Sequence, residues 1–419
     1  MKRFVTASGV GALVLVGACS LPWVGLLANR VVGDMPLFEF YGERMARGLI
    51  PYRDFYFDWA PGSVPPVVLP AWLGGSSGNS YHNWFHVLAV VYAALAMASL
   101  AATLVLMGVR RRRLYAAVIA AAALPAALGA ISINSVDYWP VLFTGAAIAA
   151  LVAGRDKLGC GLLGAGIAAK VYPVVLLPLA LILVWRRHGR RAALQAFAAC
   201  AGVIALVAGP FFVLAPGGVG YSTYLQFKRG LQMESLGASV LMALDHLGLL
   251  HVHVIVGKPY SLDIAGVPAA VFAAGLTVVL AAALVTVYVA YAAAGDTAER
   301  FVTASVAAVT AYVIFGRVLS PQYLVWLFPL VPLLGGPTGL AATALLFAAC
   351  ALTMTWFPGR FFHLAAVSEV SWFVLARNIL LVALFVVVAR RVLVSAEQPL
   401  RATLDRGRDL LHRDVADPV

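Results

Sequence analysis

Residues 158–187 read LGCGLLGAGIAAKVYPVVLLPLALILVWRR, an apolar stretch interrupted by a single lysine and closed by an arginine pair. One continuous helix would place Lys170 near the middle of a membrane, where a charged side chain is costly. Pro173 lacks a backbone N–H and disfavours helical geometry at the preceding Tyr172. The stretch therefore predicts two short helices joined at Lys170–Pro173, with the lysine at the outer face of the membrane.

The rest of the chain has the same apolar character. Of its 419 residues, 62% are hydrophobic and only 11% are charged, whereas soluble domains carry roughly 25% charged residues. Long apolar runs recur from end to end, and the short alternating segments typical of a β-barrel are absent. We predict an all-α polytopic membrane protein with about twelve transmembrane helices. We expect the four cysteines to be small buried residues: Cys19, Cys160, Cys200 and Cys350.

Short basic clusters beside the apolar runs orient these helices. Such clusters face the cytoplasm, and here they are Lys2–Arg3, Arg110–Arg113, Arg186–Arg191 and Arg390–Arg391. The net charge of +12 therefore reflects membrane topology, and we expect no nucleic-acid partner. We divide the chain into a transmembrane domain, residues 1–389, and a charged cytoplasmic tail, residues 390–419.

The same rule gives the direction in which the predicted spans cross the membrane. With the basic clusters inside, the N-terminus is inside and the large polar loops are outside. The proline-rich segment 63–75 must begin and end outside, so we expect it to be re-entrant or to lie on the membrane. The spans before the second large outer loop, 215–263, are predicted at 4–28, 84–109, 114–131, 139–153, 158–169, 174–185 and 192–214.

A polar island, Gly33–Gly62, follows the first span and reads GDMPLFEFYGERMARGLIPYRDFYFDWAPG. It holds five of the 18 acidic residues of the chain. Apolar side chains recur in it at helical spacing, which predicts an amphipathic helix on the membrane surface: Phe38, Tyr41, Met45 and Leu49. A carboxylate-rich first loop in a membrane protein indicates chemistry at the membrane surface.

Asp34 and Asp137 are the candidate catalytic residues. Asp34 stands directly before the predicted surface helix, so a helix N-cap is the structural alternative for it. Asp137 lies in the short outer loop between the third and fourth spans, where a solvated loop acid is the alternative. The convergence of further polar groups on the same outer face favours a catalytic role for Asp34.

Cations and amides on that outer face suit a phosphorylated sugar. Lys170 is either a snorkelling lysine or a ligand for a lipid phosphate at the membrane boundary. The second large loop and the loop before Tyr323 supply groups that bind phosphate and sugar hydroxyls. The candidate substrate-binding residues are Glu39, Tyr52, Arg53, Asp54, Lys170, Tyr172, Arg229, Gln232, Glu234, Ser235, Arg317 and Gln322. We predict no metal site and no cofactor, since His251 and His253 have no carboxylate close in sequence.

Four motifs of the chain match a known family. They are the polar island, AAKVYPVVLLPL (168–179), RGLQMESLGA (229–238) and GRVLSPQYLVW (316–326). In their order and spacing the chain resembles the GT-C glycosyltransferases, and most closely the polyprenol-phosphate-mannose-dependent α-mannosyltransferases of glycosyltransferase family 87. It departs from common members at ISINSVDYW (131–139), where a Gly-Gln-x-Asn type turn is expected.

The resemblance implies an inverting glycosyltransferase in the cell membrane. Its donor would be a polyprenyl-phosphate sugar, its acceptor a glycan or glycolipid, and its site would face outward. Asp34 would correspond to the catalytic base in the first outer loop. Arabinofuranosyltransferases share the family, so the sugar stays open. A transporter or flippase of lipid-linked solutes is the alternative from another class, and it would need ionisable residues well inside the spans.

Overall fold

The computed structural model of the chain describes residues 1–21, 33–74, 78–257, 261–295 and 297–414. Most of the described residues are helical. The α-helices are α1 (Lys2–Ser20), α2 (Met35–Ala46), α3 (Val64–Gly74), α4 (Gly78–Leu106), α5 (Arg111–Leu128), α6 (Tyr138–Val152), α7 (Asp156–Ala169), α8 (Leu177–Leu214), α9 (Pro216–Phe227), α10 (Leu236–His246), α11 (Val267–Ala294), α12 (Ala298–Phe315), α13 (Gly336–Met354), α14 (Phe361–Ala365) and α15 (Val370–Asp414). Short 3₁₀ turns lie at Pro61–Ser63, Ala130–Ser132, Tyr172–Leu176, Pro321–Leu327 and Val331–Leu333.

Within the described residues, seven helices are long and apolar enough to cross a membrane. The predicted all-α polytopic membrane fold is confirmed. The predicted number of spans was about twelve. The difference comes from the shorter elements α6, α7 and the two 3₁₀ turns between Pro321 and Leu333, from a kink that divides α8, and from α5, whose 18 residues begin with three arginines. The predicted end of the first span, 22–28, lies outside the described residues.

The break at Lys170 occurs where the sequence predicts it. Helix α7 ends at Ala169, and Lys170 has extended backbone angles, φ −158° and ψ 138°. A 3₁₀ turn over Tyr172–Leu176 then leads into α8. The second break in this region is at Gly189, whose φ of 79° is left-handed and divides α8 inside its arginine cluster.

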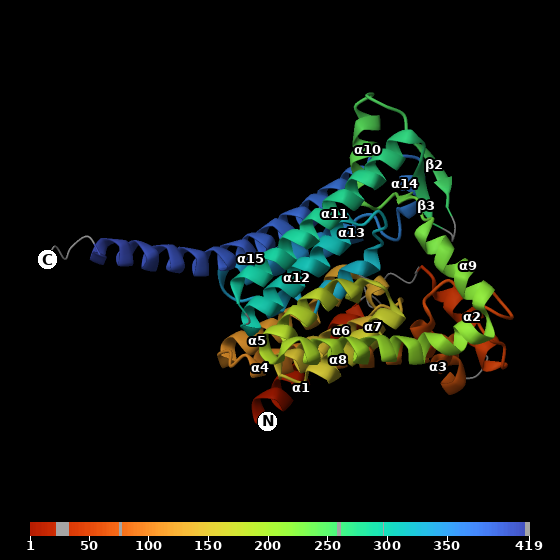
Figure 1. Ribbon diagram of the computed structural model, residues 1–419. Coiled ribbons are helices and arrows are strands. Elements are labelled where there is room, and N and C mark those ends of the chain that lie inside the picture. The colour runs from red at the N-terminus through yellow and green to blue at the C-terminus, as the bar shows by residue number, and fades with distance from the viewer. Residues whose placement is uncertain (22–32, 75–77, 258–260, 296, 415–419) are drawn as a thin grey trace.

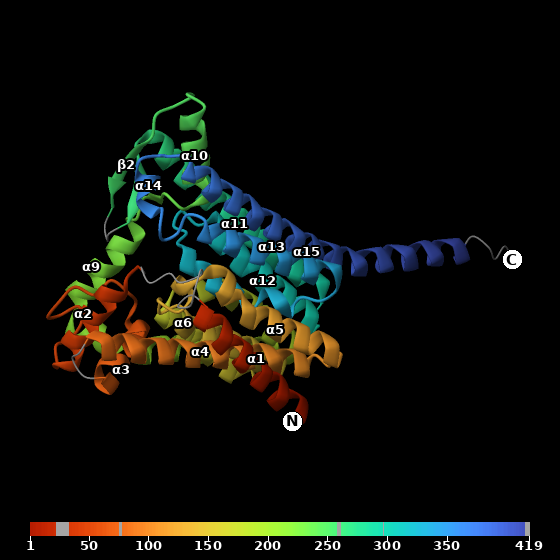
Figure 2. The same ribbon diagram turned by 180° about the vertical axis from the view of Figure 1, so that it is seen from behind.

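The helices form two layers that meet at one end and diverge at the other (Figures 1 and 2). One layer contains α1 and α4–α8, and the other contains α11–α13 and α15. Helices α2, α3 and α9 lie at the open end of the first layer, and α10 lies at the open end of the second. Helix α15 continues beyond the bundle at the closed end, so the predicted tail from Arg390 begins as part of a helix.

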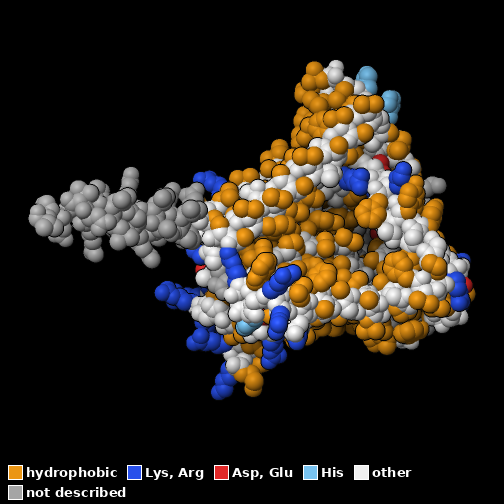
Figure 3. Space-filling model, in the orientation of Figure 1, with side chains coloured by type: hydrophobic (Ala, Val, Ile, Leu, Met, Phe, Trp, Pro, Cys, Tyr) orange, Lys and Arg blue, Asp and Glu red, His pale blue; other side chains and the backbone are white. Residues whose placement is uncertain are grey.

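Lysine and arginine side chains gather at the closed end (Figure 3). Several of them donate hydrogen bonds to carbonyl groups where helices or turns end, which is where a cation is stabilised. Arg186 donates to the carbonyls of Tyr291 and Ala292, Arg187 to Leu151 at 2.7 Å, and Arg113 to Leu333 at 2.8 Å. The basic clusters therefore also hold the helix ends of this bundle together.

The polar island has an aromatic core of its own. Phe38 and Tyr41 of α2 pack on Trp59, and Tyr41 also packs on Phe57. The predicted surface helix is confirmed, but it ends at Ala46, and Leu49 lies beyond it and is exposed. Segment 63–75 forms the short helix α3 over its described part, packed against α2 and α4.

Two other expectations concern the second outer loop and the cysteines. The loop contains a three-stranded antiparallel sheet in the order β1-β3-β2, which the all-α prediction missed. Its strands are β1 (Leu231–Gln232), β2 (His253–Val256) and β3 (Leu262–Ala265). Strands this short carry too little alternating pattern to be recognised from sequence. All four cysteines are buried and free, as predicted.

Candidate active site

The break after α7 brings Lys170 onto Asp137. The lysine Nζ lies 2.5 Å from Asp137 Oδ1, and Trp326 Nε1 donates to the same oxygen at 2.6 Å. Asp137 is 1% exposed, so its carboxylate is a buried counter-ion for a half-buried lysine. The ammonium also lies 4.8 Å from the centre of the Tyr323 ring and 5.1 Å from that of Trp326.

Aromatic stacking fixes this pair. Tyr172 stacks on Trp326 with ring centres 4.1 Å apart, and its hydroxyl lies 2.9 Å from Thr144 Oγ1. Tyr172 is fully buried, and its stacking supports the Trp326 ring. Trp326 is buried beside these charges.

Asp34 occupies the N-cap position of α2, but its side chain accepts no capping hydrogen bond. Only its backbone carbonyl is engaged there, by the N–H groups of Leu37 and Phe38. Asp34 as a residue has surface open to solvent, yet protein atoms surround its carboxylate closely enough for lost hydration to raise its pKa. Lys170 opposes that rise and the charge of Asp137 adds to it.

Arg229 connects Asp34 to two further carboxylates. Burial raises the pKa of Asp34, Asp58 and Glu234, and the charge of Arg229 opposes that rise in each of them. Asp58 accepts hydrogen bonds from Tyr56 at 2.7 Å and from Gln226 of α9 at 2.9 Å. Burial nevertheless raises the pKa of Asp58 to about 6, so this acid of the polar island belongs to the same electrostatic cluster.

Glu234 lies in the second outer loop and is 2% exposed. Its Oε2 accepts a hydrogen bond from Gln232 Nε2 at 2.7 Å, and Gln232 Nε2 also lies 3.0 Å from Ser320 Oγ. Burial raises the pKa of Glu234 to about 8, although Arg377 and Arg229 oppose the rise. The turn between β1 and α10 therefore brings to the cluster a carboxyl group whose pKa is raised.

Arg377 is the residue that sequence reasoning missed. It is fully buried in α15 and donates from Nη2 to the backbone carbonyl of Glu234 at 2.8 Å. Neighbouring Asn378 donates to the same carbonyl at 3.2 Å and to Ser239 at 3.0 Å. Arg377 Nε and Nη1 and Glu234 Oε1 are buried and have no hydrogen-bond partner among the described residues. An ionisable residue within the apolar run 370–389 was the signal that could have found it.

The cluster thus contains Asp34, Asp58, Asp137, Lys170, Arg229, Glu234 and Arg377, which come from both layers of the bundle. Figure 3 shows that the two layers enclose a hollow lined mainly by hydrophobic side chains, with charged side chains near its rim. Charge at the edge of an apolar hollow can hold a ligand that has a polar head and a hydrocarbon tail.

The other predicted binding residues have structural partners of their own. Glu39 lies 3.2 Å from His82, and the exposed pair Arg53–Asp54 is closed at 2.9 Å. Asp54 also accepts the Ile50 N–H, and both bonds lower its pKa. Tyr52 is buried in the core of the polar island, and Ser235 caps α10. Arg317 donates a hydrogen bond to the Phe227 carbonyl, and Gln322 is half-buried.

Comparison with known proteins identifies the family. A fold comparison aligns 93% of the chain with the Archaeoglobus fulgidus oligosaccharyltransferase tethered to an acceptor peptide, at 12% identity and a TM-score of 0.45. The chain spans 55% of the length of that protein. No curated protein matches the sequence. The sequence model of glycosyltransferase family 87 matches residues 59–321, more than half of the chain. The chain therefore belongs to glycosyltransferase family 87.

Proposed function

We propose that this membrane glycosyltransferase moves a sugar from a polyprenyl-phosphate donor to a glycan or glycolipid acceptor, with mannose as the first candidate. The observation that carries the proposal is the position of Asp34. Its carboxylate stands at a helix N-cap without capping, and it shares an electrostatic cluster with Lys170 and Arg229. A carboxylate that shares an electrostatic cluster with two cations suits a lipid-phosphate donor.

Lys170 and Arg229 would hold the donor phosphate in this account. Charge-assisted hydrogen bonds to phosphate are among the stronger ones in proteins, and both cations act on Asp34. Asp137 then serves as the counter-ion that positions Lys170, because its Oδ1 is already bound by Lys170 and Trp326. We therefore assign it no proton transfer.

Asp34 would accept the proton of the acceptor hydroxyl while that oxygen attacks the anomeric carbon of the sugar. The bond from that carbon to the phosphate oxygen breaks on the opposite face, and its electron pair leaves with the lipid phosphate, so the centre inverts. A general base works best when its pKa lies near the working pH. The pKa of Asp34 is raised by burial, and the two cations keep the rise in check.

The basic side chains at the closed end support one orientation of the bundle in the membrane. Lysine and arginine side chains gather at the closed end of the bundle, and such clusters face the cytoplasm. The cluster around Asp34 lies at the break after α7, beside the second outer loop and the polar island. We therefore propose a multi-pass protein of the cell membrane whose active site faces the extracytoplasmic side.

Arg377 bears on the alternative proposal that the protein is a transporter or flippase. A transporter or flippase needs ionisable residues inside its spans, and Arg377 is one. It is, however, bound to the Glu234 carbonyl and acts on the Glu234 carboxyl, so we assign it to the proposed transfer site. An arabinofuranose donor remains the alternative within the family.

The experiment uses the full chain in proteoliposomes with radiolabelled donors. Polyprenyl-phosphate mannose and polyprenyl-phosphate arabinofuranose are supplied separately, with membrane glycolipid extract as acceptor. Transfer of label to the acceptor from the mannosyl donor is the expected result. Transfer only from the arabinofuranosyl donor would mean that the transferred sugar is arabinofuranose. Movement of labelled donor across the bilayer without transfer would replace the proposal with a flippase.

A further inference from the structure

Helix α9 turns one face toward the protein and leaves the other face exposed. On the exposed face, Tyr221, Tyr224 and Phe227 are 52%, 53% and 73% exposed. Their spacing of three residues places them along one side of the helix. Tyr221 also meets the ring of Tyr56 edge-on. Exposed apolar side chains that adjoin one another mark an interaction surface, so this aromatic face is suited to a partner outside the chain.

The buried face of α9 packs on the polar island. Val219 belongs to the same buried cluster as Phe57. Ser222 Oγ donates to the Phe57 carbonyl at 2.9 Å. Gln226 Nε2 donates to the Asp58 carbonyl at 3.0 Å and to Asp58 Oδ1 at 2.9 Å. Helix α9 and the polar island are therefore held together as one unit.

Helix α9 begins where a candidate membrane span ends. Helix α8 ends at Leu214, and only Ala215 separates it from Pro216, the first residue of α9. The last turn of α8 exposes Phe212 and Val213, and α8 belongs to the helices that are apolar enough to cross a membrane. From this point α9 runs across the open end of the bundle toward β3 (Figures 1 and 2). Its aromatic face therefore adjoins the apolar surface of a span.

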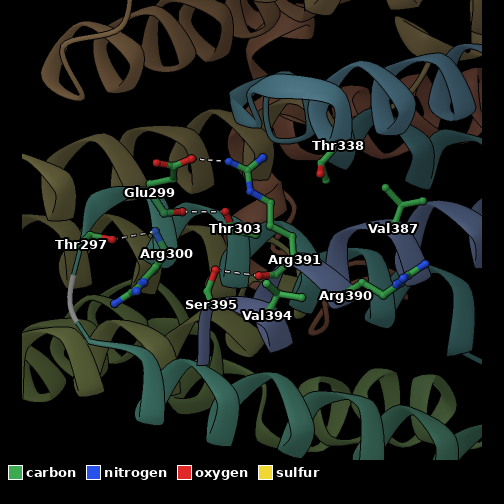
Figure 4. A pocket seen from close by; sticks show the side chains of 10 residues that line it. All are labelled: Thr297, Glu299, Arg300, Thr303, Thr338, Val387, Arg390, Arg391, Val394 and Ser395. Carbon is green, nitrogen blue, oxygen red and sulfur yellow. Dashed lines mark hydrogen bonds and ion pairs between the residues drawn. The ribbon is translucent and has the colours of Figure 1, made fainter. Parts of the chain in front are cut away.

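The composition of α9 suits the boundary of a lipid bilayer better than water. The helix is described over its whole length, reads PGGVGYSTYLQF and contains no charged residue. A polar surface of the bundle looks different, because the cavity in Figure 4 is lined by Glu299, Arg390, Arg391 and several hydroxyl groups. A helix that faces water carries charged or polar side chains on its outer face. Aromatic side chains instead gather where a membrane meets water.

Lys228 follows α9 directly and is exposed. Its Nζ lies 5.4 Å from the centre of the Tyr224 ring. A lysine at the C-terminal end of a helix is stabilised by the helix dipole. Such a side chain can lay its hydrocarbon stem along apolar surface while its ammonium group stays at the polar boundary. The aromatic face therefore ends in a positive charge that complements lipid phosphate.

We propose that α9 lies in the headgroup layer of the outer leaflet, with Tyr221, Tyr224 and Phe227 among the lipids and Lys228 beside their phosphates. The partner is the phospholipid surface itself. The choice of leaflet rests on the orientation proposed above. A tyrosine combines an apolar ring with a hydroxyl group, which suits a depth where one end is apolar and the other is wet.

This contact would set the depth of part of the proposed transfer site. Gln226 binds Asp58, and Arg229 follows Lys228 in the chain. Lipid phosphates lie in the same layer of the membrane. Helix α9 would therefore hold Arg229 and Asp58 at the depth where the phosphate of a lipid-linked donor arrives.

The test measures depth by spin labelling in phosphatidylcholine proteoliposomes of the full chain. Tyr224→Cys and Phe227→Cys carry a nitroxide in turn, with Val213→Cys as the lipid control and Arg47→Cys as the water control. Oxygen concentrates in lipid and a nickel chelate stays in water, so the ratio of their collision rates reports depth. The native cysteines are buried, and the unchanged chain gives their background. Labels at 224 and 227 should lie about 5–10 Å into the interface, with ratios between those of the two controls.

Two results would overturn the proposal. Ratios equal to that at Arg47 would place α9 in water, and exclusion of both reagents would show that another protein or a second copy covers this face. If the cysteine variants do not fold, the unchanged chain is photocrosslinked with phosphatidylcholine that carries a diazirine in its headgroup. Residues 221–228 should be labelled, and labelling only elsewhere would contradict the contact. The depth measurement needs no sugar transfer, so labels at headgroup depth in an inactive protein would support this inference and count against the proposed function alone.

Discussion

The two ends of the bundle use charged side chains in different ways. At the closed end, arginines bind neutral carbonyl oxygens where helices and turns end, as Arg187 does at Leu151 and Arg113 does at Leu333. At the open end, ionisable groups act on one another, as Lys170 pairs with Asp137 and the charge of Arg229 acts on the Glu234 carboxyl group. The first arrangement satisfies backbone groups, whereas the second keeps charges close together.

This difference distinguishes charged side chains that stabilise the fold from charged side chains that serve the function. A buried ion pair is weak evidence for stability, because the cost of removing both ions from water can exceed their attraction. Asp137 is 1% exposed and Glu234 is 2% exposed, so a cluster of this kind is a poor way to hold a fold together. Perturbed pKa values beside a hollow are typical of catalytic sites.

The largest expected effect is that of Asp34→Asn. A base that takes a proton in the transition state contributes roughly 10²–10⁴-fold in rate, so we expect at least about a hundredfold loss of sugar transfer. The melting temperature should stay close to that of the unchanged chain, because the side chain makes no capping hydrogen bond. Labelled-sugar transfer at saturating donor measures the rate.

Asp54→Asn is the matched control for that variant. Its carboxylate is bound by Arg53 and the Ile50 N–H, outside the proposed chemistry, so transfer should change little. If Asp34→Asn stays active while Glu234→Gln has no activity, the base lies in the second outer loop.

The next effect concerns the lipid phosphate. Lys170→Gln removes a charge-assisted hydrogen bond to phosphate, so apparent donor affinity should fall roughly tenfold or more. It also leaves Asp137 buried without its ammonium partner, which destabilises the fold. The double variant Lys170→Gln with Asp137→Asn should recover thermal stability but not donor affinity. Recovery of donor affinity in the double variant would make Lys170 a structural residue only.

A smaller effect should appear in the pH dependence of stability. The pKa of Glu234 is about 8 in the folded chain against an ordinary value of 4.5. Between those values the folded state holds a proton that the unfolded state has lost, so stability falls as pH rises through this window. Glu234→Gln should flatten that part of the melting-temperature profile in detergent. Parallel profiles for the variant and the unchanged chain would contradict the raised pKa.

The smallest effect belongs to the closed end. Arg187→Gln removes a hydrogen bond to one carbonyl, a loss of about 1 kcal/mol. We expect a slightly lower melting temperature and an unchanged transfer rate per folded molecule. A large loss of transfer, with the protein still folded, would break the distinction between the two ends.

Local sequence signals were sufficient for much of the fold. The proline after Tyr172 predicted the break at Lys170, and the spacing of Phe38, Tyr41 and Met45 predicted α2. Both follow from constraints within a few residues of the chain. The small sheet was missed because its pairing joins Leu231 to Ile264, far apart in sequence.

The candidate site was predicted only in part for the same reason. Asp34, Lys170 and Arg229 were singled out because each lies in or beside an outer loop, and the structure brings their charges together. The contact of Trp326 with Asp137 and that of Arg377 with Glu234 join distant segments. No periodicity encodes such contacts, although a lone arginine in an apolar run is itself a signal.

The pH dependence of the transfer step tests the central claim most directly. It is measured in single turnovers with bound labelled donor, for the unchanged chain and for Asp34→Asn. Because burial raises the pKa of Asp34 above its ordinary value of 3.8, the rate should fall as pH is lowered through a midpoint above that value. The residual rate of Asp34→Asn should lack this fall. The same acid midpoint in both proteins would contradict the account, since another group would then be the base.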